Sequence, residues 1–424
     1  MRICGARAKV LSLIAQTNKI LHEKGFLERA RKEARFFTRE RKMPFPKLMG
    51  CILGMIREST QNALFRFFHA LQSSTLMSQQ AFSEARQKIR WEAFQELFGM
   101  TVNMTYHGYY ETWQGYRVSA IDGSMLALPS DPALLEYYGG YGRGNTSPTA
   151  QGSILYDVYN RVVMDAQIAP RSIGEQRLTY KHIENLVQMV SFSKELIIFD
   201  RAYASAKLID TLHNSGIHFL FRVQRKFSRA IDEITQPGSL FPFAVNNARC
   251  VTLRVLKFAL SSGEIETLIT DLTDPCISTE SFKPLYFKRW PVETQYDELK
   301  NKLEIENFSG RTVDAIKQDF FATMYMSNIA AAAYWEAQAE VVKARAGKNN
   351  KYQYQVNVNH EIGILKDHFI AALFAKNSRW RSLKVNYILA CLAMRVTPSR
   401  PNRSLPRNPF PRRAKFHHNS KSNC

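Results

Sequence analysis

The sequence predicts an α/β protein, and two segments in the middle of the chain carry that prediction. Leu196–Phe199 is a short, continuous apolar run, which is typical of a central strand that is covered on both faces. A helical segment at roughly 205–214 and a second strand at 218–223 follow it. The order strand–helix–strand indicates a parallel sheet, and ligands bind such sheets beyond the carboxyl ends of the strands.

Composition narrows the class of protein further. The chain has 424 residues, 45% of them hydrophobic, so a globular protein with a buried core is expected. No apolar run is long enough for a membrane span, and the six cysteines are scattered without a C-x-x-C pair, which indicates neither a zinc site nor a disulfide framework. The net charge of +21 favours a polyanionic partner, nucleic acid before an anionic membrane.

Helical periodicity dominates both ends of the chain. Residues 1–107 predict a helical N-terminal DNA-binding region, with Ser78 as the cap of one of its helices. Between Lys24 and Lys47 nine basic residues face three acidic ones. This excess is either a solvated helix face or a surface that tracks nucleic-acid phosphates.

The remaining chain divides into four predicted segments. They are the first part of the α/β core (108–225), a mostly β insertion with a hairpin (226–282), the second part of the core (283–343), and a helical C-terminal region with a basic tail (344–424). The tail from Ser399 onward is rich in arginine and proline and contains no acid, so it is expected to order only against a polyanion.

Two aspartates belong to predicted strands of the core. Asp200 ends the apolar run of Leu196–Phe199. Asp122 is an acid within the otherwise apolar, strand-type run from Tyr116 to Leu128, and Gly123 comes directly after it. Asp122 is therefore either an ordinary acid at a turn or a metal ligand that projects from a buried strand.

A third acid lies in a later polar segment. On a helix, Tyr286, Arg289, Glu293 and Lys300 fall at i, i+3, i+7 and i+14, which places them on roughly one face. Pro291 fits best in a first helical turn, so a helix start near Trp290 is the alternative. A carboxylate flanked by such cations indicates a metal-assisted site that handles nucleic-acid phosphate.

Together the three carboxylates predict a site for two Mg²⁺ ions, for which Mn²⁺ is expected to substitute. Asp122 would bridge the ions, while Asp200 and Glu293 would hold one ion each. Catalysis would then consist of positioning and charge neutralisation, and the protein would need no covalent nucleophile.

The motifs resemble those of the DDE transposases of bacterial insertion sequences, within the insertion-sequence-four family. The segment from Tyr286 to Lys300 reproduces that family's Y-x2-R-x3-E-x6-K signature. Asp122-Gly-Ser resembles its first aspartate motif, and Asp200-Arg-Ala-Tyr resembles its second, with Ala202 in place of the usual glycine. The resemblance covers about 117–311 and implies an RNase H-like catalytic core that is interrupted by the β insertion.

This resemblance implies a function and a role for each matching residue. Asp122, Asp200 and Glu293 would be the metal triad of an enzyme that cleaves double-stranded DNA at transposon ends and joins it to target DNA. The residues that would contact DNA phosphates are Tyr286, Arg289, Lys300 and Arg201. A homodimer on two DNA ends, in the bacterial cytoplasm and associated with the nucleoid, is expected. The insertion has no tryptophan, whereas well-studied family members use an aromatic residue there to hold a flipped base and form a DNA hairpin. Phe241, Phe243 and Phe258 are the candidates to take that role.

Two alternatives stay open at this stage. A DNA nuclease on the same fold would hydrolyse without joining strands, although it would leave the large helical N-terminal region and the insertion unexplained. An inactive DNA-binding relic of a transposase would keep the positive net charge but would not cleave DNA. The complete set of motifs, in the right order, favours the active transposase.

Overall fold

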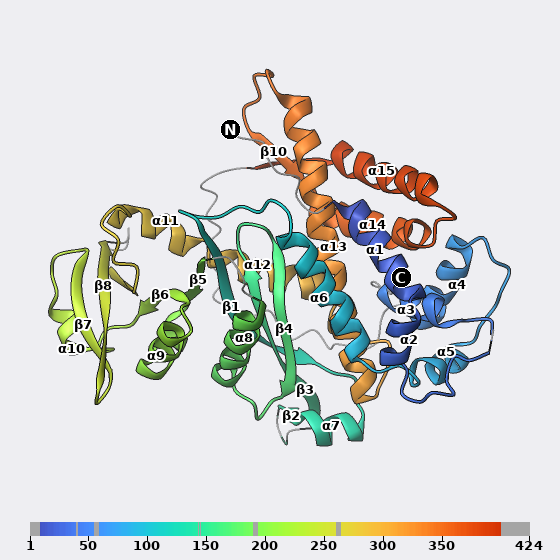
Figure 1. Ribbon diagram of the computed structural model, residues 1–424, viewed down its shortest axis with the longest axis horizontal. Coiled ribbons are helices and arrows are strands. Elements are labelled where there is room, and N and C mark those ends of the chain that lie inside the picture. The colour runs from blue at the N-terminus through green and yellow to red at the C-terminus, as the bar shows by residue number, and fades with distance from the viewer. Residues whose placement is uncertain are drawn as a thin grey trace. The chain divides into compact units, whose positions relative to one another are not determined.

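The computed structural model describes residues 9–39, 41–54, 59–142, 144, 146–189, 194–259 and 264–399. Its helices and its large mixed sheet confirm the predicted α/β class (Figure 1). The described residues form two compact units. The first unit takes them from Met1–Tyr110, Met125–Ala150 and Asp297–Cys424, and the second from Glu111–Ser124 and Gln151–Tyr296. The division into a helical N-terminal region, two parts of the core, a β insertion and a C-terminal region stays a prediction.

One sheet of nine described strands runs in the order β2-β3-β1-β5-β6-β9-β8-β7, with β4 paired to β3. The strands are β1 (Tyr116–Ala127), β2 (Gly140–Tyr141), β3 (Ser147–Asp157), β4 (Val162–Pro170), β5 (Lys194–Phe199), β6 (His218–Val223), β7 (Ser239–Asn246), β8 (Arg249–Ala259) and β9 (Ile265–Thr270). Strands β1, β5 and β6 pair in parallel, with Ala120 opposite Ile198 and Ile198 opposite Leu220. The predicted parallel sheet is therefore confirmed.

Burial on both faces of the sheet explains why the sequence of the central strand β5 contains a continuous apolar run. The side chains of Leu196–Phe199 are fully buried. Helices α8 (Glu175–Met189) and α9 (Ala206–Asn214) lie on the face of the sheet that is turned toward the viewer in Figure 1. Helix α9 buries Leu208, Ile209 and Leu212, which lie on one side of a helix.

The predicted hairpin of the β insertion is also present. Strands β8 and β9 pair antiparallel with Leu256 opposite Leu268, and β7 pairs along the other edge of β8. Strand β9 pairs in turn with β6, so these strands extend the central sheet. A short helix, α10 (Arg229–Glu233), precedes them.

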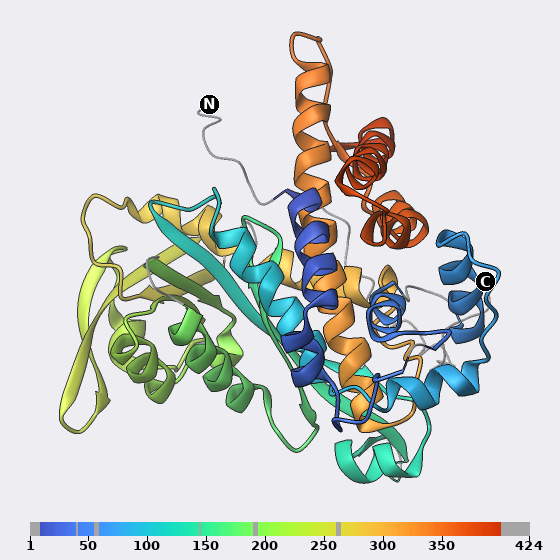
Figure 2. The same cartoon turned by 45° about the vertical axis from the view of Figure 1, so that its right-hand side comes forward.

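Helices make up most of the first unit. They are α1 (Val10–His22), α2 (Lys24–Ala30), α3 (Phe45–Leu53), α4 (Thr60–Ala70), α5 (Gln79–Arg86), α6 (Glu92–Tyr106), α7 (Pro132–Tyr138), α13 (Val313–Arg345), α14 (Val358–Leu373) and α15 (Ser378–Met394), with a small ladder of β10 (Gln353–Val356) and β11 (Val396–Ser399). Helix α13 is buried around most of its circumference, as expected of a central helix. Helices α1 and α6 run beside it (Figures 1 and 2).

The predicted helix face between Lys24 and Lys47 is wrong for the described residues between α2, which ends at Ala30, and α3, which begins at Phe45. The chain leaves the helix because its main chain pairs with another segment. The Lys32 N–H donates to the Lys88 carbonyl at 2.9 Å, and the Arg90 N–H donates to the Ala30 carbonyl at 2.7 Å. These bonds satisfy main-chain groups that a continued helix would have used internally.

Two further expectations concern the ends of elements. Ser78 caps α5 as predicted, since its Oγ accepts a hydrogen bond from the Ala81 N–H at 3.2 Å. None of the described helices is both long and apolar enough to cross a membrane. The basic tail from residue 400 lies outside the described residues.

Candidate active site

The two aspartates lie near the carboxyl ends of neighbouring parallel strands. Asp200 directly follows β5, and its Oδ1 accepts a hydrogen bond from the Arg201 N–H at 2.7 Å. Asp122 lies inside β1, as expected for an acid within the strand-type run that begins at Tyr116, and β1 continues to Ala127. Its pairing with β5 nevertheless ends at Ala120, so Asp122 is just beyond the paired part of the strand.

The segment that carries Glu293 is divided into two helices. Tyr286 belongs to α11 (Phe282–Phe287), which follows a 3-10 turn at Thr279–Ser281, whereas Glu293 belongs to the first turn of α12 (Trp290–Asn301). One continuous helical face is therefore wrong, and the alternative start at Trp290 is confirmed. Pro291 explains the break, because its ring tolerates only the first turn of a helix.

Arg289 stands in the break between the two helices and links the acids electrostatically. Its side chain is buried, and its Nη2 donates to Glu293 Oε1 at 2.7 Å. The same guanidinium interacts with Asp122 and with Asp200. The positive charge of Arg289 thus influences all three predicted carboxylates, which come from three separate elements.

Two polar atoms beside these acids have no hydrogen-bond partner among the described residues. They are the Tyr286 hydroxyl and Arg289 Nε. Tyr286 is only 3% exposed, and burial raises the pKa of its hydroxyl to about 12. Because buried polar atoms are nearly always hydrogen-bonded, these two mark a place where a further polar group fits.

Glu175 is a fourth acid at the site, and the sequence reading did not single it out as a site residue. Burial raises the pKa of Asp122 to about 6, and the charges of Glu175 and Glu293 add to that shift. A Cβ on Gly123 would lie 2.6 Å from Glu175 Oε1, so a larger residue here would push the Glu175 side chain away. The Tyr203 hydroxyl donates to Glu175 Oε2 at 3.3 Å. The available signal was a glutamate at the first position of a predicted helix.

Hydrogen bonds from behind the strand hold Asp122 in place. Its main-chain carbonyl accepts from the Ser153 hydroxyl at 3.2 Å and from the Tyr296 hydroxyl at 3.1 Å. His182 continues this chain, with Nε2 3.0 Å from Ser153 Oγ and Nδ1 2.6 Å from Asp165 Oδ2. The order Asp–His–Ser resembles a hydrolase triad, but all three side chains are buried, so the chain of bonds supports β1. His182 is therefore a structural residue.

Arg201 and Lys300 behave differently from the buried Arg289. Arg201 is exposed beside Asp200. Lys300 lies seven residues after Glu293 on α12 but belongs to the first unit, where its Nζ donates to the Met125 carbonyl at 2.7 Å.

The donor chemistry of the site fits a hard divalent cation, because Asp122, Asp200 and Glu293 offer carboxylate oxygens. In this arrangement, however, no three histidine, cysteine, aspartate or glutamate side chains among the described residues lie close enough to hold a metal ion. Glu293 is engaged by Arg289 instead. These residues fit the cation by chemistry, and Glu293 has to exchange its partner to complete the set.

Comparisons with known proteins agree with the motifs. Residues 113–329, just over half of the chain, match the family described as "Transposase DDE domain", and the chain belongs to this family. The chain is also 24% identical over 176 residues to "Putative transposase InsZ" of Escherichia coli (strain K12), in a match that covers 39% of this chain and 57% of that relative. The chain thus spans a little over half the length of this relative.

One solved structure is similar over most of its length. It is the cryo-EM structure of the piggyBac transposase synaptic complex with hairpin DNA. The match covers 92% of this chain and 87% of the piggyBac chain, with a TM-score of 0.47 and 10% sequence identity.

Proposed function

We propose that this protein is a transposase of the insertion-sequence-four family, with an RNase H-like catalytic core that cleaves DNA at transposon ends and transfers the strand to target DNA. The observation that carries the proposal is that one buried cation, Arg289, pairs with Glu293 and lies near enough to Asp122 and Asp200 for its charge to influence both. A structural ion pair needs one carboxylate, whereas three on separate elements suit phosphoryl transfer. Family membership supports the same reaction.

The three carboxylates would hold two Mg²⁺ ions, or Mn²⁺ in their place, and the bound cations would neutralise charge on the attacking and leaving oxygens. Asp122 is held on its main-chain side by Ser153 and Tyr296, which orients its carboxylate. Arg289 pairs with Glu293 in the structure; when the cations bind, Glu293 would turn to them and Arg289 would keep a buried positive charge beside the acids. The nearby orphan hydroxyl of Tyr286 is then available to donate to a DNA phosphate oxygen.

Besides the three acids, the exposed Arg201 would contact a DNA phosphate near the cleaved bond. Lys300 would contact phosphates farther along the duplex. A homodimer that holds two transposon ends is part of the same proposal, because each end needs its own set of acids.

The decisive experiment compares the wild-type chain with Glu293→Gln on a duplex that carries the element's terminal repeat. We expect Mg²⁺-dependent cleavage by the wild type and a loss of about 10³-fold in the variant, because one ligand to the ions is removed. Binding of the duplex should be kept. Asp297→Asn, an exposed acid on the same helix, is the matched control and should cleave normally.

Two results would overturn the proposal in different ways. Binding without cleavage by the wild type, in Mg²⁺ and in Mn²⁺, would identify a DNA-binding relic. Cleavage that never joins the 3′ end to a target duplex would identify a nuclease on the same fold.

A further inference from the structure

Two buried tyrosines follow two of the three acids at the same spacing along the chain. Tyr203 comes three residues after Asp200, at the end of a short 3-10 helix (Arg201–Tyr203), and Tyr296 comes three residues after Glu293 on α12. Their exposed fractions are only 4% and 8%. Residues three apart lie on roughly the same side of either kind of helix, so each tyrosine shares a side of its turn with an acid.

The Tyr296 hydroxyl joins helix α12 to strand β1. It donates to the main-chain carbonyl of Asp122 at 3.1 Å. Glu293 stands about one turn earlier on the same helix, so this bond links the element that carries one predicted metal ligand to the element that carries another. Burial, followed by the negative charge of Asp122, raises the pKa of the Tyr296 hydroxyl, which therefore keeps its proton and remains a donor.

The Tyr203 hydroxyl makes a similar link from the segment that follows β5. It donates to Glu175 Oε2 at 3.3 Å, at the first residue of α8. The Glu175 carboxylate in turn lies against Gly123, the residue after Asp122. Burial, followed by the charge of Glu175, raises the pKa of the Tyr203 hydroxyl, so this group also stays protonated. Its bond is longer than that of Tyr296, and a smaller effect is expected from its loss.

The three acids need such links because they come from separate elements and repel one another. Asp122, Asp200 and Glu293 carry like charges, and this repulsion acts to separate their elements. Arg289 offsets the repulsion, but attraction between charges depends little on direction and does not fix a carboxylate in one place. A hydrogen bond depends steeply on distance and angle, so it does. Hydrogen bonds that orient metal ligands change the metal affinity about 10–100-fold when they are lost.

We infer that Tyr296 and Tyr203 are positioning residues that set the spacing of the three acids. Tyr296 fixes the helix of Glu293 to the strand of Asp122, and Tyr203 fixes the segment of Asp200 to the same strand through Glu175. The inference rests on the proposed function, because the spacing matters only if the acids hold divalent cations together. Each hydroxyl acts through the position of a carboxylate, so its loss weakens cation binding more than it weakens the fold.

The test measures Mn²⁺ binding by electron paramagnetic resonance, with the full chain and an excess of terminal-repeat duplex. The duplex already ends at the cleavage site and carries a 3′-dideoxy end, so neither cleavage nor joining takes place. Tyr296→Phe keeps the ring and removes only the hydroxyl. We expect its Mn²⁺ affinity to fall about 10-fold, and that of Tyr203→Phe about 3-fold. Without metal, the melting temperature of either variant should fall by less than about 3 °C, because one hydrogen bond is lost.

Tyr325→Phe is the matched control for the loss of a buried hydroxyl. Tyr325 is fully buried on α13 in the first unit, and its hydroxyl lies 2.7 Å from Thr17 Oγ1. The variant loses one hydrogen bond, as Tyr296→Phe does, so its melting temperature should fall at least as far. Its Mn²⁺ affinity should nevertheless equal that of the wild type, whereas a merely structural role for Tyr296 would make the two variants alike.

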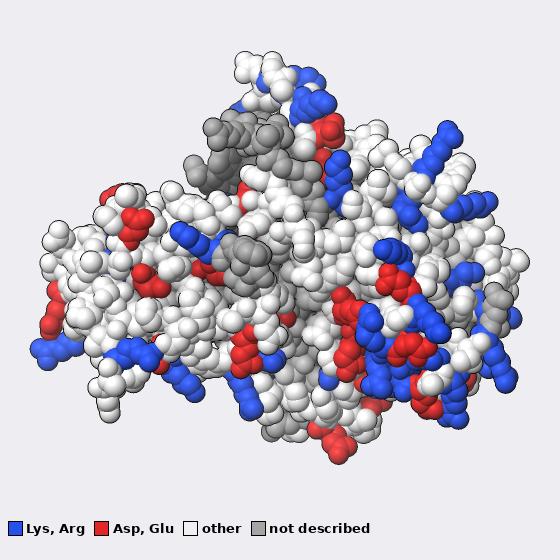
Figure 3. Space-filling view, in the orientation of Figure 1, with Lys and Arg blue, Asp and Glu red and all other residues white. Residues whose placement is uncertain are grey.

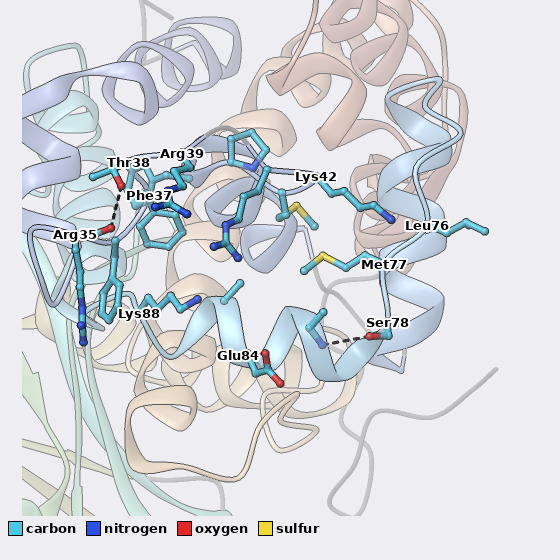
Figure 4. Close-up of a pocket in the computed structure, with 17 residues that line it drawn as sticks. Arg35, Phe37, Thr38, Arg39, Lys42, Leu76, Met77, Ser78, Glu84 and Lys88 are labelled. Carbon is cyan, nitrogen blue, oxygen red and sulfur yellow. Dashed lines mark hydrogen bonds between the residues drawn. The ribbon is translucent and has the colours of Figure 1, made fainter.

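Weak binding of Mn²⁺ to surface acids has to be separated from binding at the site. Acidic side chains are spread over the face of the molecule that Figure 3 shows, and each of them can attract Mn²⁺. Glu293→Gln identifies the ions at the site, because it removes a predicted ligand. Glu84→Gln removes an exposed acid that lines a pocket of the first unit (Figure 4), and it should leave the binding of those ions unchanged.

Two outcomes would overturn the inference and leave the proposed function standing. The first is wild-type Mn²⁺ affinity in both tyrosine variants while Glu293→Gln loses the ions, and the second is an equal loss of affinity in Tyr296→Phe and Tyr325→Phe. If Tyr296→Phe does not fold, Tyr203→Phe decides by the same criteria. If the wild type and Glu293→Gln bind Mn²⁺ equally, the acids do not hold the ions and the proposed function fails as well.

Discussion

Two buried arginines, one in each unit, show how differently the same side chain is used. Arg86 in the first unit is fully partnered, since its three nitrogens donate to Gln318 at 2.9 Å, Ser309 at 2.7 Å and Asp319 at 3.0 Å. Arg289 in the second unit has one close carboxylate, Glu293, and its Nε has no partner among the described residues. Burial is nearly the same, at 2% and 7% exposure.

The difference separates a structural cluster from a site. A buried charge whose bonds are all satisfied stabilises one arrangement of its neighbours. A buried charge with unsatisfied hydrogen-bond donors attracts nearby acids and can still donate a hydrogen bond to another group. The comparison predicts that mutations around Arg86 act on stability, whereas mutations around Arg289 act on catalysis.

The largest effect on stability is expected from Arg86→Gln. The change leaves the buried carboxylate of Asp319 without its cation, and breaking such a pair costs about 3–5 kcal/mol. Urea denaturation of the full chain measures this loss. Arg29→Gln, which breaks the exposed pair with Glu96, is the control and should cost less than about 1 kcal/mol. If both variants lost the same free energy of unfolding, the buried cluster around Arg86 would have no special structural role.

Arg289→Gln should instead lower DNA cleavage about 100-fold, because it removes a cation from the centre of the acids. The free energy of unfolding should change by less than about 1 kcal/mol, since Glu293 is partly exposed and the pair is a single i,i+4 contact. Arg222→Gln, which breaks the pair with Glu266 in the same unit, is the control and should cleave normally. A stability loss as large as that of Arg86→Gln would contradict the comparison.

Asp122→Asn should stabilise the protein in EDTA while it abolishes cleavage. Burial raises the pKa of Asp122 from 3.8 to about 6, so the folded state binds its proton more tightly than the unfolded state. At pH 7.5 the ionised carboxylate therefore destabilises the fold, by about 1–3 kcal/mol, and asparagine removes this cost. The advantage should disappear as the pH falls from about 6 to 4, where the wild-type carboxyl is itself neutral.

Thermal and urea denaturation at pH 7.5 and pH 4.5 measure the effect of Asp122→Asn. Asp157→Asn is the control with the opposite expected sign. The Asp157 carboxylate accepts hydrogen bonds from the Tyr159 and Asn160 N–H groups at 3.0 and 2.9 Å, so its loss should destabilise. Destabilisation by both changes at pH 7.5 would show that Asp122 is an ordinary structural acid.

The smallest effect is expected from Ser153→Ala, at about 1 kcal/mol of stability, because it removes a hydrogen bond to the Asp122 carbonyl and separates His182 from the strand. Its control is Ser119→Ala on β1, where the buried hydroxyl has no partner among the described residues. That change should be neutral or stabilising. Denaturation of both variants in parallel measures the contrast, and equal losses would show that the bond to Asp122 contributes nothing.

Much of the fold could be predicted because its signals are local. The apolar run Leu196–Phe199 and the alternation around β8 and β9 follow directly from burial on a sheet. The end of α2 at Ala30 could not be predicted in this way, because it depends on main-chain bonds to Lys88 and Arg90, which lie far along the chain. The extension of the sheet by β9 onto β6 also depends on pairing between distant segments.

For the site, the amino-acid sequence by itself determined which acids to consider, since Asp122, Asp200 and Glu293 stand in motifs of short, fixed spacing. Only the tertiary structure decided how they are used. It divided the Tyr286–Lys300 segment at Pro291, buried Arg289 between acids from three elements, and brought Glu175 against Gly123. Spacing along a chain reports neighbours within one helix or strand, whereas charge and burial depend on contacts between elements that no local pattern encodes.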